Sequence, residues 1–112
     1  MTIKEQTEDV LLKMGFSPAN KGFGYICNAM ELFEDNKYET CALYGKIAEQ
    51  NDTTPSRVER AIRHAFSSVI TRGDLKMIEK YLSVINTNNS ALLGTLSIRL
   101  KQERNALTLL TK

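Results

Sequence analysis

The sequence predicts an all-α fold, because its apolar residues recur at helical spacing and almost no segment alternates as a strand would. Its 112 residues suit one compact unit, so residues 1–112 are expected to form a single domain. Apolar residues make up 42% and charged residues 25%, as in ordinary globular proteins, which excludes disordered and collagen-like chains. We therefore expect amphipathic helices packed around one core.

Two helices are predicted before the centre of the chain. A helix over residues 5–14 ends at Gly15, since glycine commonly ends a helix in the left-handed conformation. A loop at residues 17–22 follows, and a second helix then runs to Asp35 and Asn36. The apolar stripes expected to face the core are Val10, Leu11 and Met14 in the first helix and Phe23, Ile26, Met30 and Phe33 in the second.

The next two helices are joined by a short turn. A short helix presents Leu43, Ile47 and Ala48 on one face and stops at residues 51–53, which tolerate turn geometry. The helix that follows has a clear start signal.

Thr54 can accept a hydrogen bond from a free N–H of the first turn, and Pro55 at the first helical position removes no needed donor. Ser56 with Glu59 offers an alternative capping box. The predicted buried stripe is Val58, Ala61, Ile62, Ala65, Phe66 and Val69, which leaves Arg57, Glu59, Arg60, Arg63, His64 and Ser67 on the other faces.

Two further helices are expected over residues 74–82 and 90–110. The last helix carries both leucines and basic residues, so it could rest on a membrane surface, but a leucine stripe at this spacing favours a core or dimer face. The stripe consists of Leu92, Leu93, Leu96, Leu100 and Leu107.

The charges are divided unevenly along the chain. Residues 1–56 contain five Lys, no Arg and nine acids, a net charge of −4, whereas residues 57–112 contain ten Lys or Arg and four acids, a net charge of +6. The total of +2 conceals this asymmetry, which favours a face that binds a polyanion.

Residues 41–72 match the spacing of a helix-turn-helix, a motif whose second helix enters the major groove of DNA. Arg60 and Arg63 would point into the groove together and match guanine, while Glu59 would accept from cytosine. An ordinary solvated face, in which the arginines pair with Glu59, is the alternative that spacing and charge leave open.

Signals for catalysis and metal binding are weak. Gly22 and Gly24 do not open a nucleotide-binding loop, because the third glycine position is Cys27 and no strand precedes them. Cys27, Cys41 and His64 are too few for a structural zinc site, and we interpret the cysteines as buried apolar residues. We therefore expect no enzyme activity, metal or cofactor. No apolar stretch reaches the roughly 20 residues of a membrane span, so we expect a cytoplasmic protein without membrane contact.

The run TTPSRVERAIRHA at residues 53–65 resembles the recognition segment of a known family, the C-terminal DNA-binding effector domain of the sporulation response regulator, stage zero sporulation protein A. The resemblance covers nearly the whole chain. The further matches are Lys21-Gly22-Phe23 with Tyr25, Leu43-Tyr44 with Ile47-Ala48, Arg72-Gly73, and Asn89-Ser90.

This resemblance implies about six helices in a winged-helix-like domain without a β wing, which binds DNA as a transcription factor, often as two copies on tandem sites. In that family the residues matching Glu59, Arg60 and Arg63 face the bases of a TGTCGAA-type box, and those matching Ser56 and Arg57 lie near the backbone. His64 completes the candidate DNA-binding residues of this chain. The resemblance also implies contact with the sigma subunit of RNA polymerase.

The chain departs from the family pattern in three ways. A receiver domain normally precedes this domain, whereas here the first helix begins close to Met1, as in an excised domain or a stand-alone relative. Residues 74–82 differ in side chains from the family stretch that touches RNA polymerase, and the loop at residues 86–89 is shortened, which bears on dimer contacts.

We therefore expect a sequence-specific regulator of transcription in a spore-forming bacterium or a relative, with a recognition helix over about residues 54–72. The alternative is a stand-alone relative that pairs with a full-length regulator instead of binding DNA.

Overall fold

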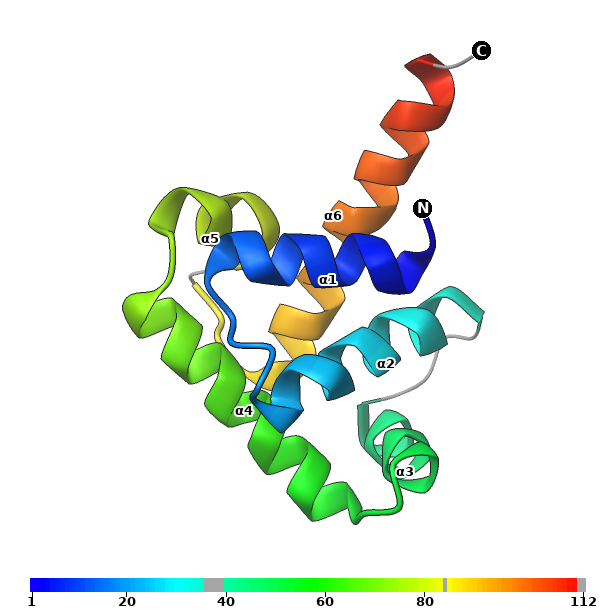
Figure 1. Cartoon of the computed structure of the whole chain (residues 1–112), viewed down its shortest axis with the longest axis vertical. Coiled ribbons are helices and arrows are strands. Elements are labelled where there is room, and N and C mark those ends of the chain that lie inside the picture. Colours follow the sequence, from blue (N-terminus) through cyan, green and yellow to red (C-terminus); the bar gives the residue numbers. More distant parts are fainter. Residues whose placement is uncertain (36–39, 84, 111–112) are drawn as a thin grey trace.

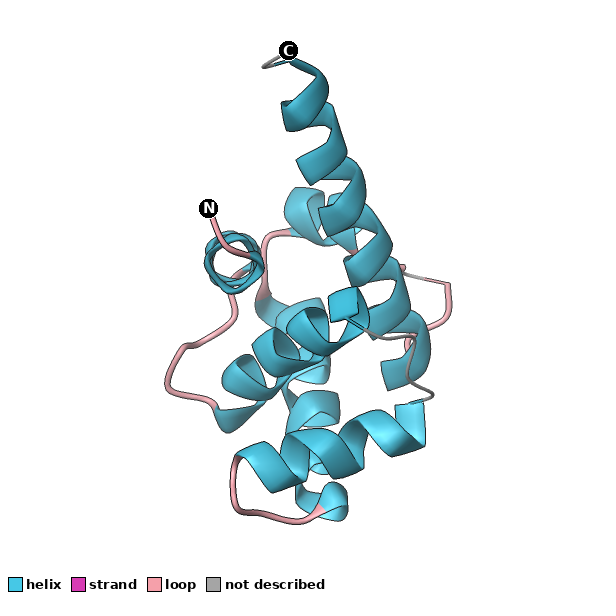
Figure 2. Cartoon of the chain, turned by 90° about the vertical axis from the view of Figure 1, so that its right-hand side faces the viewer, coloured by secondary structure: helices cyan, strands magenta, loops and turns pink. Residues whose placement is uncertain are grey.

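The chain folds into the helices α1 (Ile3–Met14), α2 (Lys21–Asp35), α3 (Thr40–Gln50), α4 (Pro55–Arg72), α5 (Leu75–Tyr81) and α6 (Asn89–Leu110) (Figure 1). The computed structural model describes residues 1–35, 40–83 and 85–110, without the side chains at 35, 40 and 41. Within these ranges the helices are joined by loops and no strand occurs (Figure 2). The predicted all-α class is confirmed.

Helix α1 begins two residues before its predicted start because a capping box precedes it. The Thr2 hydroxyl accepts from the Glu5 backbone N–H at 3.1 Å, and the Thr2 N–H donates to the Glu5 carboxylate at 2.9 Å. The helix ends at Gly15 as predicted, and a φ of 105° there explains why glycine is required. Helix α2 reaches Asp35, as predicted for the second helix, while Asn36 lies outside the described residues.

Helix α2 crosses α4 at a very short distance, and Gly22 makes this possible. A Cβ atom at Gly22 would lie 2.4 Å from the Ala61 carbonyl oxygen and 2.7 Å from the Ala65 Cβ. The first turn of α2 therefore rests directly on the backbone of α4. Figure 1 shows this crossing near the middle of α4.

A second close approach fixes the end of α1 to the loop after α4. The Asp74 N–H donates to the Met14 carbonyl oxygen at 2.9 Å, and a Cβ at Gly73 would lie 2.4 Å from that same oxygen. The middle of α4 is thus held by α2, and the loop at its C-terminal end is held by α1.

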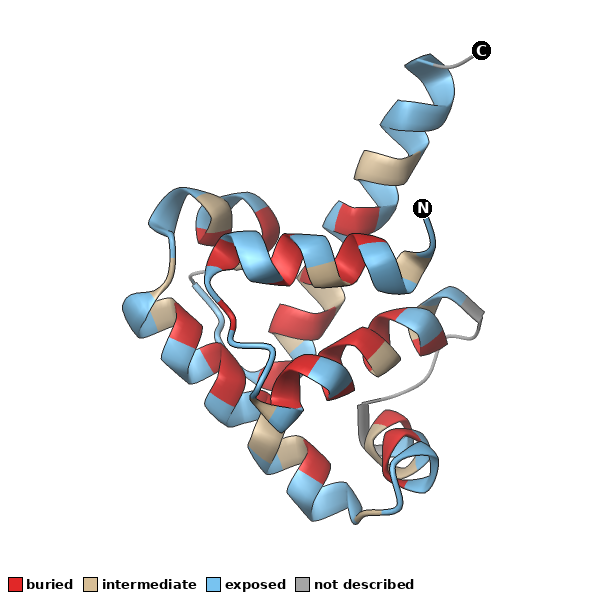
Figure 3. Ribbon diagram, in the orientation of Figure 1, coloured by how far each residue is buried: buried red, intermediate tan, exposed pale blue. Residues whose placement is uncertain are grey.

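The core collects apolar side chains from all six helices, which turn their buried residues inward in Figure 3. Most predicted stripe residues are buried, while Phe33 and Ala61 are only partly buried. The fully buried large side chains are Leu11, Met14, Ile26, Leu43, Ile47, Ile62, Phe66, Ile78, Leu92, Leu93, Leu96 and Leu100.

The leucine stripe was predicted to form a core or dimer face, and for Leu107 the core interpretation is wrong. Its side chain is 58% exposed, because α6 runs past the other helices and its last turns project from the body (Figure 1). Arg104 marks the last anchoring point, since its guanidinium donates to Gln6 of α1 at 2.8 Å and to Glu34 of α2 at 2.7 Å. None of the helices in the described ranges has the length and apolar character that a membrane crossing needs.

Candidate nucleic-acid interface

The turn between α3 and α4 is fixed by its own backbone and by α2. The Thr53 N–H donates to the Ala48 carbonyl at 3.0 Å, and Asp52 adopts a left-handed φ of 53°, which aspartate tolerates better than most residues. The Asn51 side-chain amide donates to Asn28 of α2 at 2.9 Å. The predicted break at residues 51–53 is confirmed, and a side-chain hydrogen bond links the turn to α2.

Three buried side chains set the angle between α3 and α4. The helix-turn-helix spacing predicts that Ala48 leaves room for α4 to pass close to α3 and that Val58 and Ile62 fill the angle between the two helices. All three are buried, as the spacing predicts. The residues opposite Val58 and Ile62 on α4 are therefore turned away from the core.

Helix α4 starts at the signal given by Thr54 and Pro55. The Thr54 backbone is extended, and its hydroxyl accepts from the Arg57 N–H at 3.3 Å, while Pro55 is the first helical residue. The alternative capping box of Ser56 with Glu59 does not form. The reason is that Ser56 is already inside the first turn and cannot take the extended conformation of a cap.

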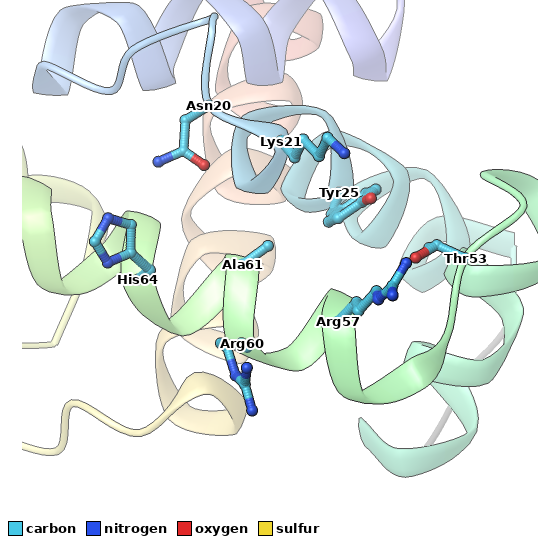
Figure 4. A pocket seen from close by; sticks show the side chains of 8 residues that line it. All are labelled: Asn20, Lys21, Tyr25, Thr53, Arg57, Arg60, Ala61 and His64. Carbon is cyan, nitrogen blue, oxygen red and sulfur yellow. The ribbon is translucent and has the colours of Figure 1, made fainter.

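The exposed face of the first half of α4 is bordered by two hollows. We call them the α2-side pocket, lined by Asn20, Lys21, Tyr25, Thr53, Arg57, Arg60, Ala61 and His64, and the α3-side pocket, lined by Tyr44, Pro55, Ser56, Glu59, Arg60 and Arg63. Arg60 borders both hollows, so it stands on the ridge between them. In Figure 4 its side chain extends away from α2, whereas Arg57 extends toward the α2 side.

The predicted site residues thus lie together on one half of α4 but divide between two sides. Arg57 and His64 line the α2-side pocket, and Ser56, Glu59 and Arg63 line the α3-side pocket. Helical geometry explains the division, because residues three and four apart share a face. Ser56, Arg57, Arg60, Arg63 and His64 are exposed, and Glu59 is half-buried.

The pairing expected for an ordinary solvated face is present for one arginine. Arg63 Nε lies 3.4 Å from Glu59 Oε1, one turn away on the same helix. Among the described residues, Arg57 and Arg60 form no salt bridge with an acid. An exposed pair of this kind contributes at most about 1 kcal/mol, so it orients Arg63 without sequestering it.

The first turn of α6 also supports α4. The Asn89 side-chain amide donates to the Glu59 backbone carbonyl at 3.1 Å, and Asn89 is itself buried. This bond fixes the rotation of α4 about its axis at the residue between Val58 and Arg60. Sequence spacing gives no sign of it, because thirty positions separate the two residues.

Helix α2 contributes to this surface in a way that the sequence pattern did not predict. Asn20, Lys21 and Tyr25 line the α2-side pocket although they lie far from the helix-turn-helix in sequence. Lys21 and Tyr25 were named only among the further matches to the family, and Asn20 was not named. The local signal that could have found them is Gly22, which marks a close approach of two backbones but does not identify the partner helix.

Cys27 confirms the prediction of a buried apolar cysteine. Its side chain is 2% exposed, and burial raises the pKa of its thiol to about 12. The side chain of Cys41 lies outside the part that the structure describes. Among the described residues, no three His, Cys, Asp or Glu side chains are grouped as a metal ion would require.

A comparison with models of known protein families gives one match that covers most of the chain. The family is described as the sporulation initiation factor Spo0A C terminal, and its model matches residues 7–100. The matched range includes the helix-turn-helix, both pockets and the anchored part of α6.

Proposed function

Because this chain belongs to the Spo0A C-terminal family, we propose that it reads one short sequence of double-stranded DNA with α4. Domains of this family are DNA-binding effectors of sporulation regulators and not enzymes. The proposal concerns how the domain binds, which sequence it prefers and which side chains make the contacts.

The observation that carries the proposal is the exposed, capped first half of α4 with its arginines. A helix with its side chains is about 10–12 Å across, which fits the roughly 12 Å width of the major groove. Arg60 stands on the ridge between the two hollows, so a groove that receives α4 meets Arg60 first. The N-terminal end of the recognition helix is also the part that reads bases in helix-turn-helix proteins.

We assign the base contacts to three residues. Arg60 and Arg63 would donate two parallel hydrogen bonds to O6 and N7 of guanine, and Glu59 would accept from N4 of cytosine. The ion pair between Glu59 and Arg63 holds both side chains on the same side of α4, which supports this assignment. Ser56, Arg57 and His64 would contact the phosphate backbone, which orients the helix without reading sequence.

The preferred site would be a TGTCGAA-type box, whose G·C pairs suit two arginines and a glutamate. Two copies of the protein would occupy tandem boxes, and contact with the sigma subunit of RNA polymerase would couple binding to transcription. The proposed location is the cytoplasm of a bacterium, where chromosomal DNA is accessible.

Fluorescence anisotropy with a labelled duplex tests this proposal. The protein and its Arg60→Ala variant are titrated against the box and against a scrambled duplex of equal composition. Arg60→Ala should lose about 1–3 kcal/mol of binding to the box, roughly a tenfold or greater change in Kd, and little on the scrambled duplex. Arg57→Ala is the matched comparison and should weaken both duplexes alike.

Equal affinity of the unaltered protein for the box and the scrambled duplex would exclude a sequence-specific reader. If Arg60→Ala loses the same affinity for both duplexes, Arg60 contacts the DNA backbone and not the bases. Circular dichroism spectra of both variants check that the helices remain formed.

A second candidate function is pairing with a full-length regulator of the same family. The observation that favours it is the projecting end of α6, where Leu107, Leu109 and Leu110 are exposed. Size-exclusion chromatography with and without box DNA, together with a pull-down of such a regulator, separates the two functions. Capture of the regulator by a protein that ignores DNA would favour pairing.

A further inference from the structure

The α2-side pocket is cationic and contains no acid. Lys21, Arg57 and Arg60 line it together with His64, whereas Glu59 lines only the pocket on the other side of Arg60. Within the described part of the chain, Lys21 and Arg57 form no ion pair. Unpaired cations around one hollow repel each other, so an anion bound there would relieve the repulsion.

Tyr25 provides a second observation that points to a ligand. Its side chain is only 8% exposed, and no hydrogen bond joins its hydroxyl to any described residue. No polar side-chain atom in that part of the chain is both fully buried and unsatisfied, so the hydroxyl keeps some exposure, and Tyr25 lines the α2-side pocket. A buried ring that presents a free O–H to a cationic hollow is suited to donate to an anionic oxygen.

The position of this pocket follows from the close helix crossing. Gly22 brings the first turn of α2 against Ala61 of α4, so Lys21 lies beside the helix that carries Arg57. In Figure 4 Asn20, Lys21 and Tyr25 lie on one side of Ala61, and Arg60 extends to the other. The Asn20 side chain accepts from the Gly22 N–H at 2.9 Å and caps α2, so the site depends on side chains rather than on free helix N–H groups.

We propose that the α2-side pocket binds one phosphate of the DNA backbone on the rim of the major groove, with Lys21, Tyr25 and Arg57 as its donors. This inference rests on the proposed function, because it requires α4 in the groove. A helix in the major groove has a phosphate backbone on each side. Since Arg60 faces the bases between the two hollows, the α2-side pocket meets one backbone, and Lys21 and Tyr25 become DNA-binding residues outside the helix-turn-helix.

The first experiment compares Lys21→Gln with Lys4→Gln by anisotropy at several salt concentrations. Lys4 is an exposed lysine of α1 outside both pockets, so its variant has the same net charge. Lys21→Gln should weaken the box and the scrambled duplex alike, by about three- to tenfold, and reduce the salt dependence of log Kd by about one unit of slope. Lys21→Gln that behaves like Lys4→Gln would overturn the inference.

A duplex scan then identifies the phosphate. Each phosphate in and beside the box is replaced in turn by an uncharged methylphosphonate. At one position the replacement should weaken binding by the unaltered protein and by Lys4→Gln, but should not weaken Lys21→Gln further. Independent, additive losses at every position would contradict a direct contact.

Tyr25→Phe tests the hydroxyl contact without disturbing the fold, because it removes only the hydroxyl and keeps the buried ring. It should retain the melting temperature and lose affinity several-fold on both duplexes. An NMR titration with inorganic phosphate tests whether the pocket binds free phosphate instead of a phosphate of the DNA backbone. If Lys21→Gln loses phosphate binding but keeps its DNA affinity, the pocket takes a free anion and the inference is wrong.

The outcomes separate this inference from the function on which it rests. If the unaltered protein prefers the box and Lys21→Gln does not change DNA affinity, the proposed function is supported and the phosphate site is wrong. If the protein binds all duplexes equally and Lys21→Gln still weakens this binding, sequence-specific recognition is wrong and the phosphate site is supported. Failure to bind any duplex overturns both.

Discussion

Glu59 is the single acid in the first half of α4, between residues 55 and 67. Its carboxylate lies 3.4 Å from the Arg63 guanidinium, and it would repel DNA phosphates wherever it does not face a cytosine. Under the proposed function, an acid in this position would lower affinity for wrong sequences more than for the right one. We therefore propose that Glu59 contributes to specificity rather than to total affinity.

We expect Glu59→Gln to bind a scrambled duplex several-fold more tightly and to discriminate less well between that duplex and the box. The lost negative charge explains the first effect, and the lost acceptor for cytosine explains the second. Glu79→Gln on α5 removes the same charge away from both pockets and serves as the control. Tighter binding without any loss of discrimination would contradict the assigned base contact.

Cys27 gives a prediction that depends only on burial. Because its pKa is raised to about 12, the thiol should not react with a disulfide reagent between pH 7 and 9 in the folded protein and should react fully in denaturant. A Cys41→Ser background leaves Cys27 as the single thiol. Fast labelling under native conditions would mean that α2 does not bury this side chain.

The same pKa gives the sign of a pH effect on stability. An unfolded chain loses the thiol proton near pH 9.0, whereas the folded chain keeps it until about pH 12. The stabilising contribution is therefore complete below pH 9 and is lost as the pH rises through this interval. A urea-denaturation series from pH 8 to 10 should show the decrease beginning near pH 9, and an increase in stability over that range would contradict it.

At the scale of the helices, the crossing of α2 over α4 depends on Gly22. In Gly22→Ala the new Cβ would lie 2.4 Å from the Ala61 carbonyl oxygen, so the helices must separate. We expect a loss of about 1–3 kcal/mol in the free energy of unfolding, measured with urea. Gly24→Ala is the matched control, because its new Cβ would meet no described atom within 4 Å beyond its neighbours and its own helix backbone, and because alanine favours the helix.

Equal stability of the two glycine variants would contradict the close crossing. If Gly22→Ala is destabilised as expected, its DNA affinity offers a further check, since Lys21 is displaced together with the start of α2.

The helices differ in how far the sequence could predict them. The start of α4 was predictable because Thr54 and Pro55 act within one turn of the chain. The capping box of Thr2 with Glu5 is equally local, and its spacing was present in the sequence, although the predicted helix began later. The exposure of Leu107 was not predictable, because periodicity continues along α6 after its neighbouring helices have ended.

The candidate site was predictable only in part, for the same physical reason. Arg60 and Arg63 follow from the register of a single helix, which the buried stripe defines. Lys21 and Tyr25 reach the site through a tertiary contact between α2 and α4, and sequence spacing does not encode that contact. The role of Asn89, which donates to the Glu59 carbonyl, is hidden in the same way.

At the scale of the whole molecule, the acidic and basic halves of the sequence do not form separate acidic and basic faces of the fold. Lys21 comes from the acidic half, yet it lines a hollow with Arg57 and Arg60 from the basic half. The first half of α4 lies at the opposite end of the long axis from the projecting end of α6 (Figure 1). A second protein seated on the end of α6 would therefore leave the arginine-bearing face open.

The central claim is that this face of α4 receives DNA. The most direct test is to add the box duplex to ¹⁵N-labelled protein and follow the backbone amide signals by NMR. We predict that the largest shift changes fall on residues 54–67 of α4, with a second group at residues 20–25. Changes confined to residues 105–110, with α4 unaffected, would contradict the account.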